Sequence, residues 1–189
     1  NKGANAVVRK EIAIAIKECL RHEGIQGVLV SHGSSTVPRY IVDEINALGG
    51  DIQNAYGIPL SQLKEVSHCG IGKINVDTDI RLAVTRNIRE YFVTHPEAKE
   101  DDRINGIWNL MENNPKVFDP RAFLTPIMDT VMYGNVPNDA VLEITNLIRR
   151  GVMEVVGSLI VEFGEVGKAS KVEVRTLDEM AEFYRKEGI

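Results

Sequence analysis

Two short apolar segments of this chain each end in a run of small and polar residues. The first is Val28-Leu29-Val30, which leads into Ser31-His32-Gly33-Ser34-Ser35. The second is Gly70-Ile71-Gly72-Lys73-Ile74, which leads into Asn75-Val76-Asp77-Thr78-Asp79. Short runs of apolar and β-branched residues are typical of strands. The pattern predicts one strand at about 27–31 and a second that ends near Asn75, each followed by a polar loop.

Apolar residues at helical spacing surround these strands. The helix before the first strand has an apolar face of Val8, Ile12, Ala15, Ile16, Cys19 and Leu20. Further helices are predicted at 38–48, 60–66, 78–93, 140–162 and 177–186, and the last has Thr176 and Glu179 at capping-box spacing. We expect insertions at 97–115, with a short helix of its own, and at 133–139.

The loop after the first strand offers groups for both a metal ion and a phosphate. A neutral His32 imidazole binds divalent metals, Gly33 lets a ligand approach the backbone, and Ser34 and Ser35 offer hydroxyl and amide groups. After the second strand, Asp77 and Thr78 begin a predicted helix, where free backbone N–H groups favour an anion. The residues alone leave a second interpretation open, in which the first loop is an ordinary turn before the helix at Pro38.

The composition is that of an ordinary globular domain. Hydrophobic residues make up 43% and charged residues 26% of the 189 residues, and the net charge is -5. This charge argues against a nucleic-acid partner, and no apolar run approaches the roughly 20 residues of a membrane span. Cys19 and Cys69 lack metal-ligand spacing, so we expect two unpaired thiols in or near the core of a cytoplasmic protein.

Two later segments complete an ordered set of motifs, Phe118-Asp119-Pro120-Arg121 and Glu162-Phe163-Gly164 with Ala169-Ser170-Lys171. Together with the two strand-end motifs they resemble the class II fructose-bisphosphate aldolases, from about residue 27 to about residue 184. The resemblance implies an α/β fold, the TIM (β/α)8 barrel. Residues 1–95 would be the last two βα units of that barrel, and residues 96–189 a helical C-terminal extension that joins the oligomer interface.

The resemblance also implies the role of each site residue. His32 would be a zinc ligand, and one zinc ion per active site is expected, with a monovalent cation as a further candidate. Gly33 and Ser35 would contact the phosphate of dihydroxyacetone phosphate. The residues that would close round the same end of the substrate are Asn75, Asp77 and Thr78. Arg81 would reach the far phosphate, and Arg121 would bind that phosphate in the neighbouring subunit's site.

The implied reaction is the reversible, zinc-dependent cleavage of fructose 1,6-bisphosphate to dihydroxyacetone phosphate and glyceraldehyde 3-phosphate, as in glycolysis and gluconeogenesis. An imine formed on Lys73 is an alternative mechanism. A tagatose-type ketose-bisphosphate aldolase is an alternative function, although Asp77 favours the fructose epimer. A non-catalytic partner that binds sugar phosphates is another. We expect a homo-oligomer, because Arg121 serves a neighbour and the apolar stripe from Val141 to Phe163 needs a partner surface.

The family's Asp-His-Gly segment, its second Ser-His-Gly segment and its catalytic Glu have no counterpart in this chain. No catalytic residue is therefore assigned here, and the expected Asp and Glu lie N-terminal to it. The remaining histidines, His22, His68 and His95, are expected at the surface or in structural roles. A complete barrel needs about 250 residues. We expect a missing N-terminal half, removed by truncation or supplied by another chain, and a fragment that is inactive alone.

Overall fold

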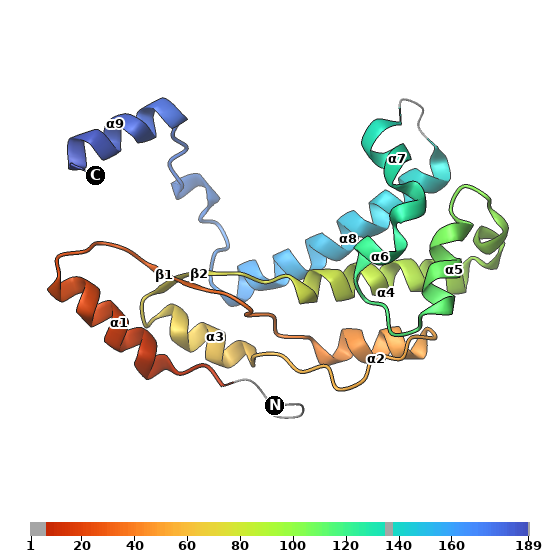
Figure 1. Ribbon diagram of the computed structural model, residues 1–189, viewed down its shortest axis with the longest axis horizontal. Coiled ribbons are helices and arrows are strands. Elements are labelled where there is room, and N and C mark those ends of the chain that lie inside the picture. Colours follow the sequence, from red (N-terminus) through yellow and green to blue (C-terminus); the bar gives the residue numbers. More distant parts are fainter. Residues whose placement is uncertain (1–6, 135–137, 189) are drawn as a thin grey trace. The chain divides into compact units, whose positions relative to one another are not determined.

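The computed structural model of this chain describes residues 7–134 and 138–188. Most of its elements are helices (Figure 1). In chain order they are α1 (Lys10–His22), β1 (Leu29–Ser31), α2 (Arg39–Ala47), α3 (Leu60–Ser67), β2 (Ile71–Ile74), α4 (Thr78–Thr94), the 3-10 turn η1 (Pro96–Glu100), α5 (Asn105–Asn113), α6 (Pro120–Phe123), α7 (Thr125–Tyr133), α8 (Asp139–Glu162), the 3-10 turn η2 (Ala169–Lys171) and α9 (Leu177–Glu187).

The chain forms two compact units, Asn1–Gly157 and Ser158–Ile189, with the boundary inside α8. The first unit contains both strands and the helices from α1 to most of α8. The second contains the end of α8, η2 and α9. In α9 the hydroxyl of Thr176 accepts the Glu179 N–H, and the Glu179 carboxylate accepts the Thr176 N–H at 2.7 Å, which confirms the predicted capping box.

β1 and β2 form a parallel pair, with Val30 opposite Lys73 and Ser31 opposite Ile74. Helix α2 follows β1, and α4 follows β2 (Figure 1). Because the strands are parallel, their carboxyl ends lie at one edge of the sheet, and the two polar loops meet there. The described residues thus contain the two predicted βα units, and closure of the whole barrel stays a prediction.

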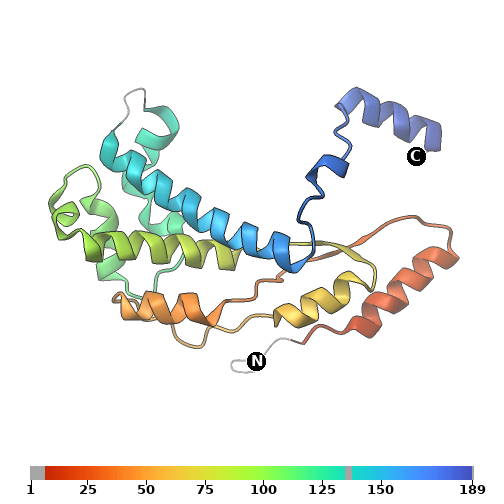
Figure 2. The ribbon, with the colours of Figure 1, turned by 180° about the vertical axis from the view of Figure 1, so that it is seen from behind.

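The core of the first unit is built round α4. Buried α4 side chains such as Ile88 and Phe92, both 0% exposed, pack with residues of α5 to α8. Both views show the first part of α8 alongside α4 (Figures 1 and 2). At Gly151 a Cβ would lie 2.8 Å from the Val84 backbone nitrogen, so the glycine permits this close approach. Burial of each such apolar side chain contributes about 1.5–3 kcal/mol.

The apolar stripe of α8 packs inside the chain over most of its length. Its buried members within the first unit are Val141, Ile144, Leu147 and Val155. Several of them belong to the same core cluster as Ile88 and Phe92. The expectation that this stripe needs a partner surface is therefore wrong from Val141 to Val155, because α4 and its neighbours already cover it. Arg149 and Arg150 of the same helix are exposed.

The predicted apolar face of α1 is not the buried one. Ala13 is the buried residue of this helix, whereas Ile12 is 56% and Ile16 is 43% exposed. Cys19 is also exposed, so its expected place in or near the core is wrong, although both cysteines are free as expected. An apolar stripe is buried only where another element covers it, and the contacts of α1 with α3 leave Ile12 and Ile16 uncovered.

The remaining predicted helices are confirmed with small shifts of their ends, and the 97–115 stretch contains η1 and α5. Residues 135–137 of the predicted 133–139 insertion lie outside the described residues. Over the described ranges, no helix is both long enough and apolar enough to cross a membrane.

Candidate functional site

The loop after β1 lies against the loop after β2. Gly33 has φ +63°, the left-handed conformation that glycine adopts without strain. Ser34 is fully buried, and its N–H donates to the Asn75 carbonyl at 3.3 Å. Its hydroxyl lies 2.6 Å from that of Ser31 at the end of β1. These bonds fix the two strand-end loops to each other.

His32 and Asn75 contact each other across the two loops. The Nδ1 atom of His32 lies 3.0 Å from the Asn75 amide nitrogen, and the ring is exposed. Because an amide nitrogen donates, Nδ1 accepts in this arrangement and Nε2 carries the ring proton; a metal on Nε2 requires the Asn75 amide oxygen to face Nδ1 instead. Within the described part of the chain, however, no group of three His, Cys, Asp or Glu side chains could hold a metal ion. The described residues therefore place no complete set of metal ligands around His32.

Ser35 caps helix α4 from outside the helix. Its hydroxyl oxygen accepts the Asp77 N–H at 3.3 Å and the Thr78 N–H at 3.0 Å. The prediction of free N–H groups at this helix start is therefore wrong for these two amides, because the serine hydroxyl already accepts both. An oxyanion at this position would be bound in place of, or next to, the Ser35 hydroxyl.

Asp79, in the first turn of α4, holds the loop that contains Ser35. This side chain is 1% exposed. Its carboxylate accepts the Thr36 N–H at 2.9 Å, the Thr36 hydroxyl at 2.8 Å and the Val37 N–H at 2.8 Å. Val37 has φ +51°, a conformation that a β-branched residue rarely adopts. Thus Ser35 caps α4, and α4 in return fixes the residues that follow Ser35.

A third segment, at Gly57 and Ile58, contacts the backbone of the same loop. The Ile58 N–H donates to the Ser35 carbonyl at 3.0 Å. A Cβ on Gly57 would lie 2.2 Å from the Thr36 carbonyl carbon and oxygen. Glycine is therefore required here, because any side chain would overlap the loop backbone.

Arg81, one turn further along α4, joins two carboxylates. Its Nε donates to Asp77 Oδ1 at 2.8 Å, and its Nη2 also contacts Asp77. Its Nη1 donates to Asp119 Oδ2 at 2.7 Å. Asp119 in turn accepts the Arg121 Nη2 at 2.6 Å and the Arg121 backbone N–H at 3.1 Å. The four side chains form a continuous chain of ion pairs, Asp77, Arg81, Asp119 and Arg121.

The charges of these four side chains balance. Hydrogen bonds from Arg121, assisted by the charge of Arg81, lower the pKa of Asp119 to about 2. The same pairing raises the pKa of Arg121. A phosphate that binds here therefore meets no net positive charge, and its binding depends on the directed N–H groups of the two guanidinium groups. Arg121 is the more accessible donor, because its side chain is 74% exposed, against 26% for Arg81.

The structure brings together all of the residues that the sequence predicted for the site. Direct contacts join His32 to Asn75, Ser35 to Asp77 and Thr78, and Arg81 to Asp77. Gly33 lies in the loop between His32 and Ser35. Arg121 reaches Arg81 of its own chain through one shared carboxylate. Its predicted role in a neighbouring subunit stays a prediction.

Three residues that organise the site were missed by sequence reasoning: Thr36, Asp79 and Asp119. Two of them had a local signal. Asp79 is an acidic residue in the first turn of a predicted helix, on the side where Leu82 and Ala83 are buried. Asp119 precedes a proline, which is typical of a helix cap, and its side chain accepts the Arg121 N–H. Neither signal indicates a distant partner.

The other histidines lie away from this loop pair. His22 is paired with Glu23 at 3.3 Å, and His95 stacks on Tyr91 with 4.7 Å between ring centroids. His68, at the end of α3, is exposed. Surface and structural roles, as expected, fit these positions.

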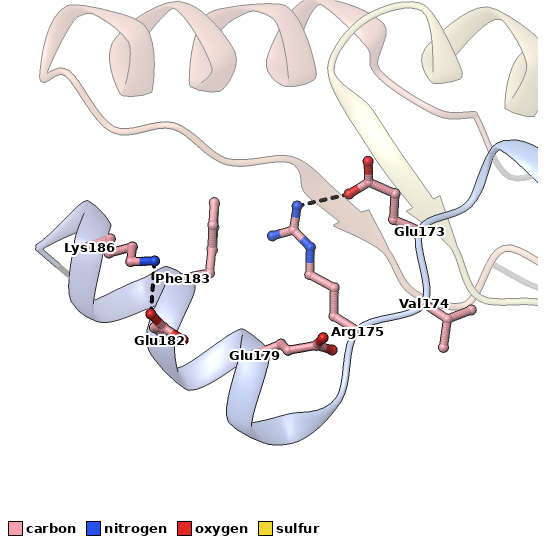
Figure 3. A pocket seen from close by; sticks show the side chains of 7 residues that line it. All are labelled: Glu173, Val174, Arg175, Glu179, Glu182, Phe183 and Lys186. Atoms are coloured by element: carbon pink, nitrogen blue, oxygen red, sulfur yellow. Dashed lines mark hydrogen bonds and ion pairs between the residues drawn. The ribbon is translucent and has the colours of Figure 1, made fainter.

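The second unit contains a hollow of about 550 Å³ beside α9. Figure 3 shows that its charged side chains pair among themselves, Arg175 with Glu173 at 2.9 Å and Lys186 with Glu182 at 2.8 Å. The Arg175 guanidinium also lies 4.7 Å from the centre of the Phe183 ring. The hollow contains none of the predicted site residues.

Comparisons with known proteins agree on one family. Residues 4–137 match the family described as "Fructose-bisphosphate aldolase class-II". The "Fructose-bisphosphate aldolase" of Xanthobacter flavus is 33% identical over 156 residues, which are 82% of this chain and 33% of that protein. The protein of the same name from Thermus caldophilus is 36% identical over 141 residues, which are 75% of this chain and 33% of that protein. The protein of the same name from Giardia intestinalis is 31% identical over 176 residues, which are 93% of this chain and 42% of that protein. The chain spans about a third of the length of the first of these relatives.

Proposed function

Because this chain belongs to the class II fructose-bisphosphate aldolases, we propose that it binds both phosphates of fructose 1,6-bisphosphate. It would do so within an enzyme that cleaves this sugar reversibly to dihydroxyacetone phosphate and glyceraldehyde 3-phosphate. The observation that carries the proposal is the pair of loops after β1 and β2, which places serine, amide and arginine groups at one edge of the sheet. These groups are typical ligands of phosphate oxygens.

The phosphate of the dihydroxyacetone half would bind between Gly33, Ser35 and Thr78. The left-handed Gly33 lets the phosphate approach the backbone closely. The Ser35 hydroxyl hydrogen would be a donor to this phosphate, because its oxygen already accepts the Asp77 and Thr78 N–H groups. The bonds from Asp79 hold this loop before the substrate arrives, so little ordering of the loop is needed on binding.

The second phosphate would bind at Arg81 and Arg121, which Asp119 brings together within one chain; Arg121 in the neighbouring subunit's site stays the alternative. Both guanidinium groups are oriented by Asp119, and Arg81 also by Asp77. Bidentate contacts from arginine suit the geometry of phosphate oxygens. Asn75, which contacts His32, and Asp77, which contacts Arg81, would close round the dihydroxyacetone end of the substrate, and Asp77 would favour the fructose over the tagatose epimer.

We propose zinc as the metal, with His32 as one of its ligands. A zinc ion on Nε2 requires the ring proton on Nδ1, and the Asn75 side-chain amide, turned so that its oxygen faces Nδ1, would accept that proton and fix the ring. When bound, zinc would act as a Lewis acid toward the ketone oxygen of the sugar. The described residues offer no group of three ligands that includes His32, so a complete set would need ligands from the rest of the protein. A monovalent cation beside the phosphate is a further candidate.

We also propose that the proton-transferring Asp and Glu belong to the rest of the protein, and that this chain alone is inactive. The whole enzyme would act on sugar phosphates in the cytoplasm, in glycolysis or gluconeogenesis, as a homo-oligomer. Residues 1–95 would complete its barrel, and residues 96–189 would extend it.

The experiment that tests the proposal replaces His32, the proposed zinc ligand of this chain. In the whole protein, His32→Ala should lower the zinc content to below half of an equivalent and abolish cleavage of fructose 1,6-bisphosphate, because a three-residue zinc site rarely holds the metal with two. His68→Ala is the matched control, since this exposed histidine has no place in the site. A fully zinc-loaded and active His32→Ala protein would contradict the proposal.

A further inference from the structure

Three polar residues of α4 lie four residues apart, at Arg81, Thr85 and Arg89. Residues at this spacing occupy one face of a helix. All three donate hydrogen bonds to the segment between Met111 and Asp119. The side of α4 that starts at the phosphate loops therefore also fixes the segment that contains Asp119.

Thr85 holds the residue next to Asp119. Its side chain is fully buried, and its hydroxyl donates to the Phe118 carbonyl at 2.9 Å. A threonine hydroxyl inside a helix commonly bonds a carbonyl of its own helix. Here it bonds a residue 33 positions away, so the bond fixes tertiary structure.

Arg89 holds the beginning of the same segment. It is 1% exposed, and its Nη2 donates to the Met111 carbonyl at 3.2 Å and to the Pro115 carbonyl at 3.4 Å. Its Nε is buried and has no partner within the described residues. Burial lowers the pKa of this guanidinium. A buried cation bound by carbonyls alone is costly, and an apolar side chain of similar size would fill the space at lower cost.

The segment ends next to Asp119, whose carboxylate is shared by Arg81 and Arg121. Asp119 follows Phe118 directly and accepts Arg81 Nη1 at 2.7 Å and Arg121 Nη2 at 2.6 Å. A shift of Phe118 would therefore move Asp119, and with it the exposed guanidinium of Arg121. Contacts of this kind to phosphate depend on position, so a displaced Arg121 loses much of its interaction energy.

We propose that Thr85 and Arg89 are positioning residues for the second phosphate: they fix the 111–118 segment, and through Asp119 they place Arg121 beside Arg81. The inference rests on the proposed function, in which these two arginines bind the phosphate remote from His32. A role in fold stability alone would affect all substrates alike. Positioning affects the substrate that carries the second phosphate.

The test compares two substrates of the whole protein, fructose 1,6-bisphosphate and fructose 1-phosphate, which lacks the second phosphate. Thr85→Val keeps the shape of the side chain and removes its hydroxyl. We expect the KM for the bisphosphate to rise about tenfold, as for the loss of one charge-assisted hydrogen bond, with kcat within about twofold. For the monophosphate, kcat and KM should stay within about twofold, and Thr85→Ser should restore the bisphosphate KM.

Thr94→Val is the matched control, because the Thr94 hydroxyl donates to the Glu90 carbonyl of its own helix at 2.8 Å. It should change neither KM. Should Thr85→Val fail to fold, Arg89→Lys takes its place, because it keeps a cation but is too short to bond both carbonyls. The same selective rise in KM is expected. Equal changes for both substrates, or an unchanged bisphosphate KM, would overturn the proposal.

A second readout separates this inference from the proposed function. The Nε–H signal of Arg121 in the NMR spectrum, assigned by its loss in Arg121→Lys, should shift in Thr85→Val and stay in place in Thr94→Val. If the whole protein does not cleave fructose 1,6-bisphosphate, the proposed function fails and this signal alone decides the inference. An Arg121 signal that is the same in wild type and Thr85→Val would refute the positioning role.

Discussion

Replacement of Asp79 by asparagine removes one bond from the loop that is expected to hold a phosphate. Asp79 Oδ2 accepts both bonds from Thr36, at 2.9 and 2.8 Å, and Oδ1 accepts the Val37 N–H at 2.8 Å. In Asp79→Asn the amide oxygen can still accept from Thr36. The amide nitrogen then faces the Val37 N–H, and two donors oppose each other. The Val37 amide therefore loses its partner at a site where the acidic side chain is 1% exposed.

The size of the effect follows from these contacts. A hydrogen bond to a charged group contributes about 1.5–3 kcal/mol, and an unpaired buried donor costs about 1–3 kcal/mol, but the two overlap. We expect Asp79→Asn to lower the free energy of unfolding by about 2–4 kcal/mol. Val37 has φ +51°, which costs a non-glycine residue about 1–2 kcal/mol. Without its bond to Asp79, Val37 should relax to an extended conformation and move Ser35 with it.

Urea unfolding followed by circular dichroism measures this loss, as a lower midpoint with an unchanged dependence on urea concentration. Asp43→Asn is the matched control, because Asp43 is an exposed residue paired with Arg39 at 3.0 Å. Its free energy of unfolding should change by less than about 1 kcal/mol. If Asp79→Asn changes the unfolding free energy as little as Asp43→Asn does, the reasoning about the buried carboxylate is wrong.

Two further predictions concern the same site. Gly57→Ala should lower the free energy of unfolding by more than about 2 kcal/mol, because its Cβ would lie 2.2 Å from the Thr36 carbonyl. Gly27→Ala is the control and should have little effect, because a Cβ there meets nothing within 4 Å. Urea unfolding midpoints compare the two variants, and equal midpoints would contradict the steric argument. The pKa of Asp119 is about 2 in the folded chain and 3.8 ordinarily, so its ion pairs stabilise the fold above pH 3.8 and this contribution is lost as the pH falls toward 2. The difference in unfolding free energy between wild type and Asp119→Asn should therefore shrink between pH 3.8 and pH 2. A difference that stays constant over this range would refute the prediction.

The helices were predictable because their signals are local. The spacing of apolar residues in the 78–93 and 140–162 stretches predicted α4 and α8 within a residue or two of their ends. The cap of α9 depends on Thr176 and Glu179, which are three residues apart, so the sequence alone identified it. In the same way, apolar runs that end in polar residues marked where β1 and β2 stop.

Burial was less predictable than periodicity. The stripe of α1 was correctly identified as helical, yet Ile12 and Ile16 are largely exposed in this chain. The stripe of α8 was expected to need a partner surface, yet its members Val141, Ile144 and Leu147 belong to the core round α4, and Val155 is also buried. Periodicity tells which residues share a face, whereas burial depends on which other element lies against that face.

The sequence by itself determined which residues could form the site: a histidine, glycine and serines after one strand, and an asparagine, aspartate and threonine after the next. Only the tertiary structure decided how they are connected. Ser35 caps a helix that begins 43 residues later, at Thr78, and Arg81 meets Arg121 through Asp119. These bonds depend on the register of two parallel strands and on the packing of α4 against the 111–118 segment. A pattern of neighbouring residues contains no information about either, because each bond joins groups that only the folded chain brings within reach.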